Sequence, residues 1–268
     1  MTLISRNKFL SSFCIISSLF LVLFIVLFAI FLSQGKISTF PYSIQFSTIS
    51  LRSLLFSNFS IFPLISIAFL GFYSFFSSLF VRYSFEKTQS PEIIFFFGFL
   101  IGCFFELFRL LIPLFNLWNS FSPLVIFIGK ITFAGRFISY FCFLFSTLFS
   151  TEVQNQQIEK NLLVIFLLSC IFSNFIPIST NKIMPSISPA YGFEKLFILI
   201  ILTLLFITFI TLLFINKKDY SFSYILVTLG YTILIFACNL FFTFLGIILL
   251  SLGTSKYLKN IHNYYLWR

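Results

Sequence analysis

The chain has 268 residues, of which 59% are hydrophobic, 22% are aromatic and only 9% are charged, with a formal net charge of +10. A soluble domain carries about 25% charged and about 45–50% apolar residues, so this composition excludes an ordinary water-soluble globule. It also excludes a disordered chain, which combines low hydrophobicity with high charge density. We therefore expect an all-α integral membrane protein whose surroundings are the lipid bilayer, with no nucleic acid as a partner.

Phenylalanine occupies 46 positions, which makes the chain phenylalanine-rich. An aromatic-lined cavity is one explanation. The favoured explanation is compositional, because Ile, Leu, Asn, Lys and Ser are abundant as well, as an AT-rich coding sequence produces wherever any apolar residue serves. The phenylalanine count therefore does not indicate a binding site.

Seven apolar stretches reach the roughly 20 residues that a helix needs to cross a hydrocarbon core about 30 Å thick. The predicted spans are Phe9–Leu32, Phe59–Val81, Ile93–Trp118, Pro123–Phe149, Leu162–Ile178, Leu196–Ile215 and Tyr224–Leu252. The first is too long for the apolar region of a signal peptide and is read as a retained span. The expected fold is a bundle of about seven transmembrane helices in one polytopic domain, residues 1–255, followed by a short interfacial tail, residues 256–268. No soluble domain is expected.

The orientation of this seven-span arrangement is balanced, because each side of the membrane receives seven Lys and Arg residues. The side of the N-terminus holds Arg6, Lys8, Arg82, Lys87, Lys160, Lys217 and Lys218, and the other side holds Lys36, Arg52, Lys182, Lys195, Lys256, Lys259 and Arg268. Since the first helix usually has most weight, we favour a cytoplasmic N-terminus and an external C-terminus in a bacterial-type cell membrane.

Two longer loops, Ser33–Asn58 and Ser179–Lys195, are predicted on one side of the membrane. They carry the turn sequences Phe40-Pro-Tyr42 and Ser186-Ile-Ser-Pro-Ala-Tyr191, whose aromatic rings are expected to be exposed. These loops either recognise something in water or simply connect helices at the interface.

Enzyme motifs are missing from the sequence. The one histidine, His262, lies in the tail, so neither a metalloprotease H-E-x-x-H, a buried Ser–His pair nor haem ligation by buried histidines is available. The five cysteines, all inside predicted spans, have no metal-binding spacing and are read as small packing residues. We therefore predict a non-enzymatic protein with no cofactor and no metal.

Four ionisable residues lie within the predicted spans: Glu106 and Arg109 in the third, and Lys130 and Arg136 in the fourth. A charged residue at the centre of a membrane helix costs about 2.5–3.5 kcal/mol, so each is expected to face protein or water. Glu106 and Arg136 are almost equally distant from the connection near Ser120, which predicts that they are level with each other in an antiparallel pair of helices. Lys130 projects away from this face.

Small residues mark the faces on which these charges lie. On the third span Gly98, Gly102, Glu106 and Arg109 fall within about 80° of arc, and Gly98 and Gly102 form a GxxxG motif that permits close helix approach. The expected helix-packing residues are Gly98, Gly102, Gly135, Ser139, Asn239 and Gly246. By the same reasoning spans three, four, five and seven form the interior, and spans one and six face lipid.

Two roles are open for Glu106, Arg109 and Arg136. They can form a structural ion pair that fixes the register of two helices, or a site whose second arginine receives an anionic group. The leading hypothesis is a sensor or assembly component that binds a small anionic ligand, an anionic lipid or a partner membrane protein through this seam. The alternative is a permease or transporter subunit for an anionic solute. The seven-span layout resembles that of sensory modules of bacterial signalling proteins, without a shared motif.

Overall fold

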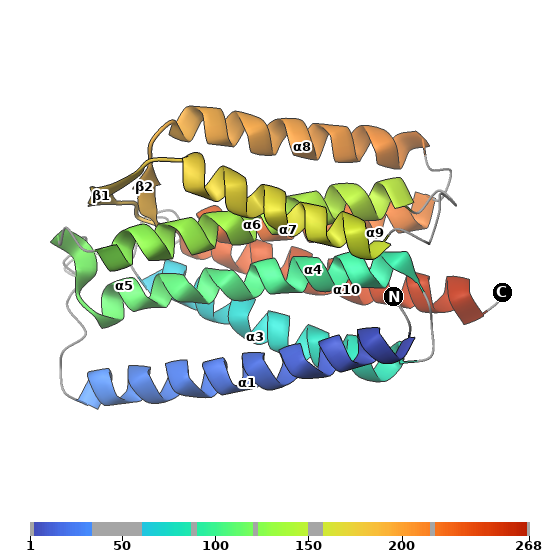
Figure 1. Cartoon of the computed structure of the whole chain (residues 1–268), viewed down its shortest axis with the longest axis horizontal. Helices are drawn as coiled ribbons and strands as arrows, with labels where there is room; N and C mark the ends of the chain where they lie inside the picture. Colours follow the sequence, from blue (N-terminus) through green and yellow to red (C-terminus); the bar gives the residue numbers. More distant parts are fainter. Residues whose placement is uncertain are drawn as a thin grey trace.

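The computed structural model describes residues 3–33, 61–86, 90–119, 123–149, 158–214 and 218–266 (Figure 1). Most of the predicted loop Ser33–Asn58, including Phe40 and Tyr42, lies outside these residues.

The described part of the chain is a bundle of long helices with one small hairpin (Figure 1). In chain order the elements are α1 (Leu3–Ser33), α3 (Ile61–Ser84), α4 (Pro91–Phe105), the 3-10 helix η1 (Glu106–Leu110), α5 (Leu111–Leu114), the 3-10 helix η2 (Leu117–Asn119), α6 (Pro123–Phe149), α7 (Ile158–Phe175), β1 (Ile178–Ile183), β2 (Pro189–Tyr191), α8 (Glu194–Phe214), α9 (Lys218–Phe236) and α10 (Leu240–Leu266). Seven helical segments are long and apolar enough to cross a membrane, and Ser221–Phe236 is a shorter apolar helix.

The predicted seventh span, Tyr224–Leu252, is wrong as a single helix. The chain leaves the helix after Phe236 and begins α10 at Leu240. There the carbonyl of Asn239 accepts hydrogen bonds from the backbone N–H and the hydroxyl of Thr243, at 3.0 and 2.9 Å.

Glycines allow α9 and α10 to lie close together in antiparallel directions. A Cβ atom at Gly230 would stand 2.5 Å from the backbone nitrogen of Leu250, and one at Gly253 would stand 2.7 Å from that of Val227. The glycines at both crossing points thus leave room for the neighbouring backbone.

The α10 helix also includes most of the predicted C-terminal tail. Residues 256–266 form its last turns, and Tyr257 and Ile261 are buried there. The ring of His262 meets that of Phe85, directly after α3, at a centroid distance of 5.7 Å. The ends of the described chain therefore lie at the same end of the bundle, which we call the terminal face (Figure 1).

The opposite end, which we call the hairpin face, carries the antiparallel pair β1 and β2 (Figure 1). These two short strands were not predicted in a chain that is otherwise helical, and Tyr191 at the end of β2 is buried rather than exposed as expected. Ile178 faces Tyr191 and Ser179 faces Ala190 in the register of the pair. β-branched residues in β1 and the rigid backbone of Pro189 fit an extended hairpin better than they fit a helix.

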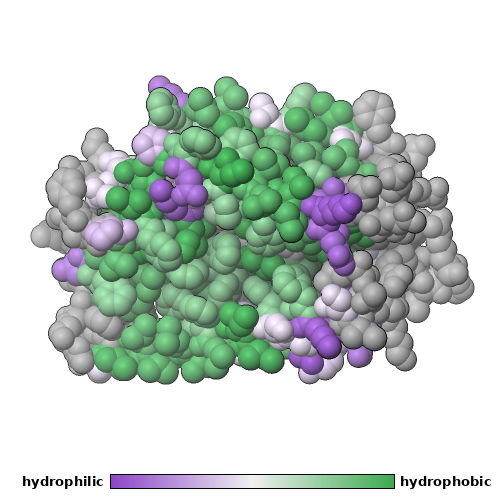
Figure 2. All heavy atoms as spheres, viewed as in Figure 1, coloured by the Kyte–Doolittle hydropathy of each residue, from purple (hydrophilic) through white to green (hydrophobic). Residues whose placement is uncertain are grey.

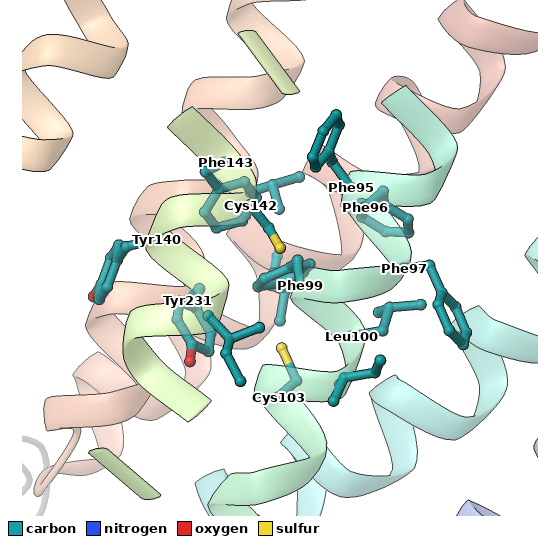
Figure 3. Close-up of a cluster of buried hydrophobic side chains, with 14 of the residues drawn as sticks. Phe95, Phe96, Phe97, Phe99, Leu100, Cys103, Tyr140, Cys142, Phe143 and Tyr231 are labelled. Atoms are coloured by element: carbon teal, nitrogen blue, oxygen red, sulfur yellow. The ribbon is translucent and has the colours of Figure 1, made fainter. Parts of the chain in front are cut away.

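The core lies where α4 crosses α6, with α9 packed against both (Figure 3). Phe99 of α4 meets Phe143 of α6 at a centroid distance of 4.4 Å and Tyr231 of α9 at 5.1 Å. Glycine permits this approach, because a Cβ atom at Gly98 would stand 2.5 Å from the sulfur of Cys142. Close helix contact at small residues is typical of membrane bundles.

The burial of two helices, α3 and α7, differs from the prediction. The most buried segments are Glu92–Leu114 and Pro123–Leu148, followed by α3, whereas α7 is the least buried of the candidate spans. The fifth predicted span is thus peripheral, because only a narrow line through Ser169 and Ser173 faces inward. On α3 the stripe of Ser66, Ser74 and Ser78 is buried, and it was not recognised in the sequence. As expected, α1 and α8 are mostly exposed.

The outer surface of the described helices is apolar. Figure 2 shows hydrophobic side chains over most of one face, with hydrophilic residues in a few separate places. Leu19 of α1, Phe76 of α3 and Phe206 of α8 are each more than 60% exposed. An apolar exterior of this extent favours contact with lipid rather than with water.

Hydrogen bonds connect the beginning of α1 to the end of α3 at the terminal face. The guanidinium of Arg6 is buried and donates hydrogen bonds to the carbonyls of Phe85 and Glu86, at 2.7 and 3.0 Å. A cation at this position complements the carbonyls that a helix leaves unpaired at its C-terminal end. Arg6 is therefore a structural residue and not only a topology signal.

The crossing of α4 and α6 predicts a specific sensitivity at Gly102. A Cβ atom there would stand 2.4 Å from the carbonyl oxygen of Gly135 and 2.0 Å from the hydroxyl of Ser139, so G102A must separate the two helices. We expect it to lower the free energy of unfolding by about 1–3 kcal/mol. Thermal unfolding of the purified protein in detergent measures this loss.

The matched control is G129A on α6, the helix that α4 crosses. Its new Cβ atom would meet only side-chain atoms of Ile178 and Pro189, at 2.8–3.3 Å, and Ile178 can adjust. If G102A unfolds at the same temperature as the natural protein, the close crossing of α4 and α6 is incorrect.

Candidate functional site

A buried carboxylate joins two arginines between α4 and α6. Glu106 Oε1 accepts a hydrogen bond from Arg136 Nε at 2.7 Å, and Glu106 Oε2 accepts one from Arg109 Nη1 at 2.7 Å. Arg136 Nη2 also reaches Oε2, at 3.3 Å, so this arginine grips the carboxylate with two nitrogens. All three side chains are at most 1% exposed. We call these residues the charged cluster.

The local backbone explains why Glu106 and Arg109 meet. They lie in the 3-10 helix η1, in which residues three apart are directly aligned. Pro113 has no N–H to donate to the carbonyl of Arg109, so the ordinary α-helical hydrogen bond cannot form at this point. Pro113 thus coincides with the change from α-helix to 3-10 helix, and the 3-10 geometry aligns Glu106 with Arg109.

Arg136 is held from two further directions by aromatic rings. Its guanidinium carbon lies 5.7 Å from the ring centroid of Tyr191 in β2 and 5.9 Å from that of Phe236 at the end of α9. The negative faces of such rings attract a cation, and more strongly where water is excluded. The β-hairpin and the α9–α10 turn therefore both contribute to the site, although neither was predicted to do so.

The tip of the hairpin contacts the second arginine. The carbonyl of Ile187 accepts a hydrogen bond from Arg109 Nε at 3.3 Å, and Ile187 is itself buried. Ile187 has a φ of 57°, which is unusual for a β-branched residue. Two backbone hydrogen bonds hold it there, from Ile187 N–H to Met184 and from Met184 N–H to Ser188. A residue kept in a rare conformation often marks a functional position.

The cluster has one more positive charge than negative charge. Among the described residues, no partner accepts a hydrogen bond from Arg109 Nη2, although this atom is fully buried. Ionised side chains buried in a low dielectric are normally paired and hydrogen-bonded, since desolvation of each costs several kcal/mol. Arg109 therefore retains one donor that can receive an anionic oxygen.

Two hydroxyl groups lie near the tip of the β-hairpin, beside the carbonyl that accepts a hydrogen bond from Arg109 Nε. Ser186 and Ser188 flank Ile187, both are buried, and their hydroxyl oxygens are 3.0 Å apart. Hydroxyl groups can both donate and accept hydrogen bonds. The sequence analysis placed these serines in a connecting loop, and their proximity to Arg109 was not foreseen.

The remaining predicted residues are distributed between two helix pairs. Gly98, Gly102, Gly135 and Ser139 lie where α4 meets α6, and Ser139 donates to the carbonyl of Phe99 at 3.4 Å. Gly246 lies at the α9–α10 contact, and Asn239 lies in the turn between those helices.

Lys130 is outside the charged cluster. Its ammonium group donates to the side chain of Asn174 in α7 at 3.3 Å. Cys14, Cys103 and Cys142 are buried, Cys170 is exposed, and Cys238 lies between α9 and α10. No group of three His, Cys, Asp or Glu side chains suited to a metal ion occurs within the described ranges.

Comparison with models of protein families, with curated proteins and with solved structures gives no match to this chain.

The arrangement predicts unequal effects of neutralising each charge. E106Q leaves two arginines buried without an acid and should lower the free energy of unfolding by about 3–5 kcal/mol. R136Q leaves Glu106 paired one-to-one with Arg109, so a smaller loss of about 1–3 kcal/mol is expected. The double variant E106Q/R136Q should lose less than the sum of the two single variants.

Thermal and denaturant unfolding of the purified variants in one detergent provide these comparisons. K130Q is the matched control on α6, where the partly exposed ammonium lies outside the cluster. A result in which R136Q is more damaging than E106Q would contradict the assignment of Glu106 as the bridging acid.

Proposed function

We propose that the chain is a non-enzymatic multi-pass membrane protein that binds an anionic group at the charged cluster, as a sensor or assembly component. The proposal rests on the fully buried Nη2 of Arg109, which lacks a hydrogen-bond acceptor among the described residues. A small solute, a lipid headgroup or an acidic side chain of a partner membrane protein has the required chemistry.

The helical hairpin at the end of the chain supports a definite orientation. If α9 and α10 each cross the bilayer, both ends of the described chain are on one side. Within the described residues, Arg6, Lys8, Arg82, Lys160, Lys218, Lys256 and Lys259 are then at the terminal face, whereas only Lys182 and Lys195 are at the hairpin face. The positive-inside rule therefore makes the terminal face cytoplasmic.

The sequence analysis found no such imbalance because it treated Tyr224–Leu252 as one helix, which assigned Lys256 and Lys259 to the side opposite the N-terminus. With α9 and α10 as two helices, these two lysines lie with Arg6 and Lys8 at the terminal face.

An anion would approach Arg109 from the hairpin face, which this orientation places outside the cell. The tip of the β-hairpin lies against Arg109 through the carbonyl of Ile187, and the neighbouring Ser186 and Ser188 supply hydroxyl groups. A ligand oxygen on Arg109 Nη2 would offset the surplus charge of the cluster. Binding and the fold would then stabilise each other.

A transporter subunit for an anionic solute is the second candidate. The observation in its favour is a pair of helix interruptions near the charges: η1 contains Glu106 and Arg109, and the break after Phe236 is next to Arg136. Transporters commonly bind their substrates at such discontinuous helices. Uptake of a labelled anion into proteoliposomes would favour this candidate over a sensor.

Impermeant labelling tests the orientation. In a background with C170S and C238S, single cysteines are introduced as K8C and N263C near the terminal face and K195C near the hairpin face, all at exposed positions. Cys14, Cys103 and Cys142 are buried and should not react. In intact cells an impermeant maleimide should label only K195C, and after permeabilisation it should label all three.

If N263C and K195C are both labelled in intact cells, the end of α10 lies on the same side of the membrane as the beginning of α8. That result would overturn the arrangement in which α9 and α10 each cross the bilayer. Absence of the protein from the membrane fraction would overturn the proposal as a whole. The two failures are therefore distinguishable.

Mass spectrometry of small molecules and lipids that co-purify with the protein tests the site. An anionic species is expected with the natural protein, and R109Q should reduce its occupancy at least tenfold because it removes a buried charge-assisted contact. K195Q, which changes a cation that is exposed, is the control. If R109Q folds and retains the same species, the anion does not bind at the charged cluster.

A further inference from the structure

A groove on the side of the bundle, far from the charged cluster, has a different chemistry. It lies between the second half of α3 and the second half of α10 and has a volume of about 560 Å³. Its lining consists of Phe76, Ser77, Phe80, Ser84, Phe85, Thr254, Ser255, Leu258, Lys259 and His262. Pockets of about 300–1,000 Å³ are typical of small-molecule and cofactor sites.

One end of the groove is apolar and the other end is polar. Phe76 and Phe80 are exposed on the side of α3, and Leu258 is buried beneath them on α10. Lys259 and His262 are one helical turn apart near the terminal face, where both are exposed. The apolar part of the groove thus ends at cationic and hydrogen-bonding groups, which is the pattern expected of a site for an amphipathic ligand.

The electrostatics of this end favour an anion. None of the described residues that line the groove is acidic, whereas Lys259 carries a positive charge and the His262 ring can donate a hydrogen bond. The groove also opens near the face where most of the described cations lie. Basic pockets between transmembrane helices on the cytoplasmic side commonly bind anionic lipid headgroups.

We propose that this groove binds an anionic phospholipid of the cytoplasmic leaflet, with its headgroup at Lys259 and His262 and an acyl chain along Phe76, Phe80 and Leu258. The inference rests on the membrane location and orientation proposed above, but not on ligand binding at the charged cluster. Ser77 and Ser255 matter through their small size, because they leave the space between α3 and α10 that the acyl chain occupies.

Native mass spectrometry of the full-length protein tests the lipid site. The probes are phosphatidylglycerol and phosphatidylcholine with identical palmitoyl and oleoyl chains, added to the detergent-purified protein. We expect tighter binding of phosphatidylglycerol, and K259A should weaken it about fivefold while leaving phosphatidylcholine unchanged. S255F fills the groove without changing a charge and should weaken the binding of both lipids.

K256A is the matched control, because it removes the same charge from the same helix. The ammonium of Lys256 lies 5.5 Å from the ring of Phe222 and outside the groove. A loss in K256A as large as that in K259A means diffuse attraction and overturns the site. Full lipid binding in S255F means a surface headgroup contact and overturns the groove.

Equal affinity for the two lipids also overturns the proposal. The variants alter exposed residues, and thermal unfolding without added lipid confirms that each is folded. Failure of the labelling experiment instead removes the premise of a cytoplasmic leaflet. Failure at the groove alone leaves the charged cluster and the orientation untouched.

Discussion

One carboxylate, that of Glu106, connects parts of this structure that are far apart in the sequence. It binds Arg136 of α6 directly and Arg109 within η1, and through these arginines it is linked to the β-hairpin and the end of α9. Three buried charges between apolar helices cannot be left unpaired, since desolvation costs several kcal/mol for each. The requirement to hold them together therefore restricts how α4, α6, the β-hairpin and α9 can be arranged.

Close helix approach makes the cluster possible. Gly102 and Gly135 bring the backbones of α4 and α6 together beside Glu106, and Phe105 packs over Gly135. In lipid, where no hydrophobic effect drives helices together, packing at small residues and interhelical polar contacts supply the association. The glycine contact and the charged contact thus stabilise the same interface, one through van der Waals packing and the other through electrostatics.

The surplus positive charge distinguishes this cluster from a closed ion pair. The carbonyl of Ile187 and the rings of Tyr191 and Phe236 offset part of it, but they are dipolar or quadrupolar groups and carry no net charge. An anion at Arg109 would neutralise the cluster. The groove at Lys259 uses the same attraction at the opposite end of the bundle, in an exposed setting where the interaction is weaker and depends on ionic strength.

The sequence by itself determined the helices and the central charged contact, because both follow from local rules. Apolar length predicted six helical spans near their observed bounds, although the third is divided among α4, η1, α5 and η2. Equal distance from the α4–α6 connection predicted that Glu106 and Arg136 are level. Only the tertiary structure decided that residues 224–252 fold back on themselves, since Ala237-Cys238-Asn239 interrupts the apolar run without a proline or glycine. It also decided that Ile187 and Tyr191 reach the arginines. These contacts join residues more than 50 positions apart. Hydrophobic periodicity reports only which face of a segment is apolar, so it carries no information about such partners.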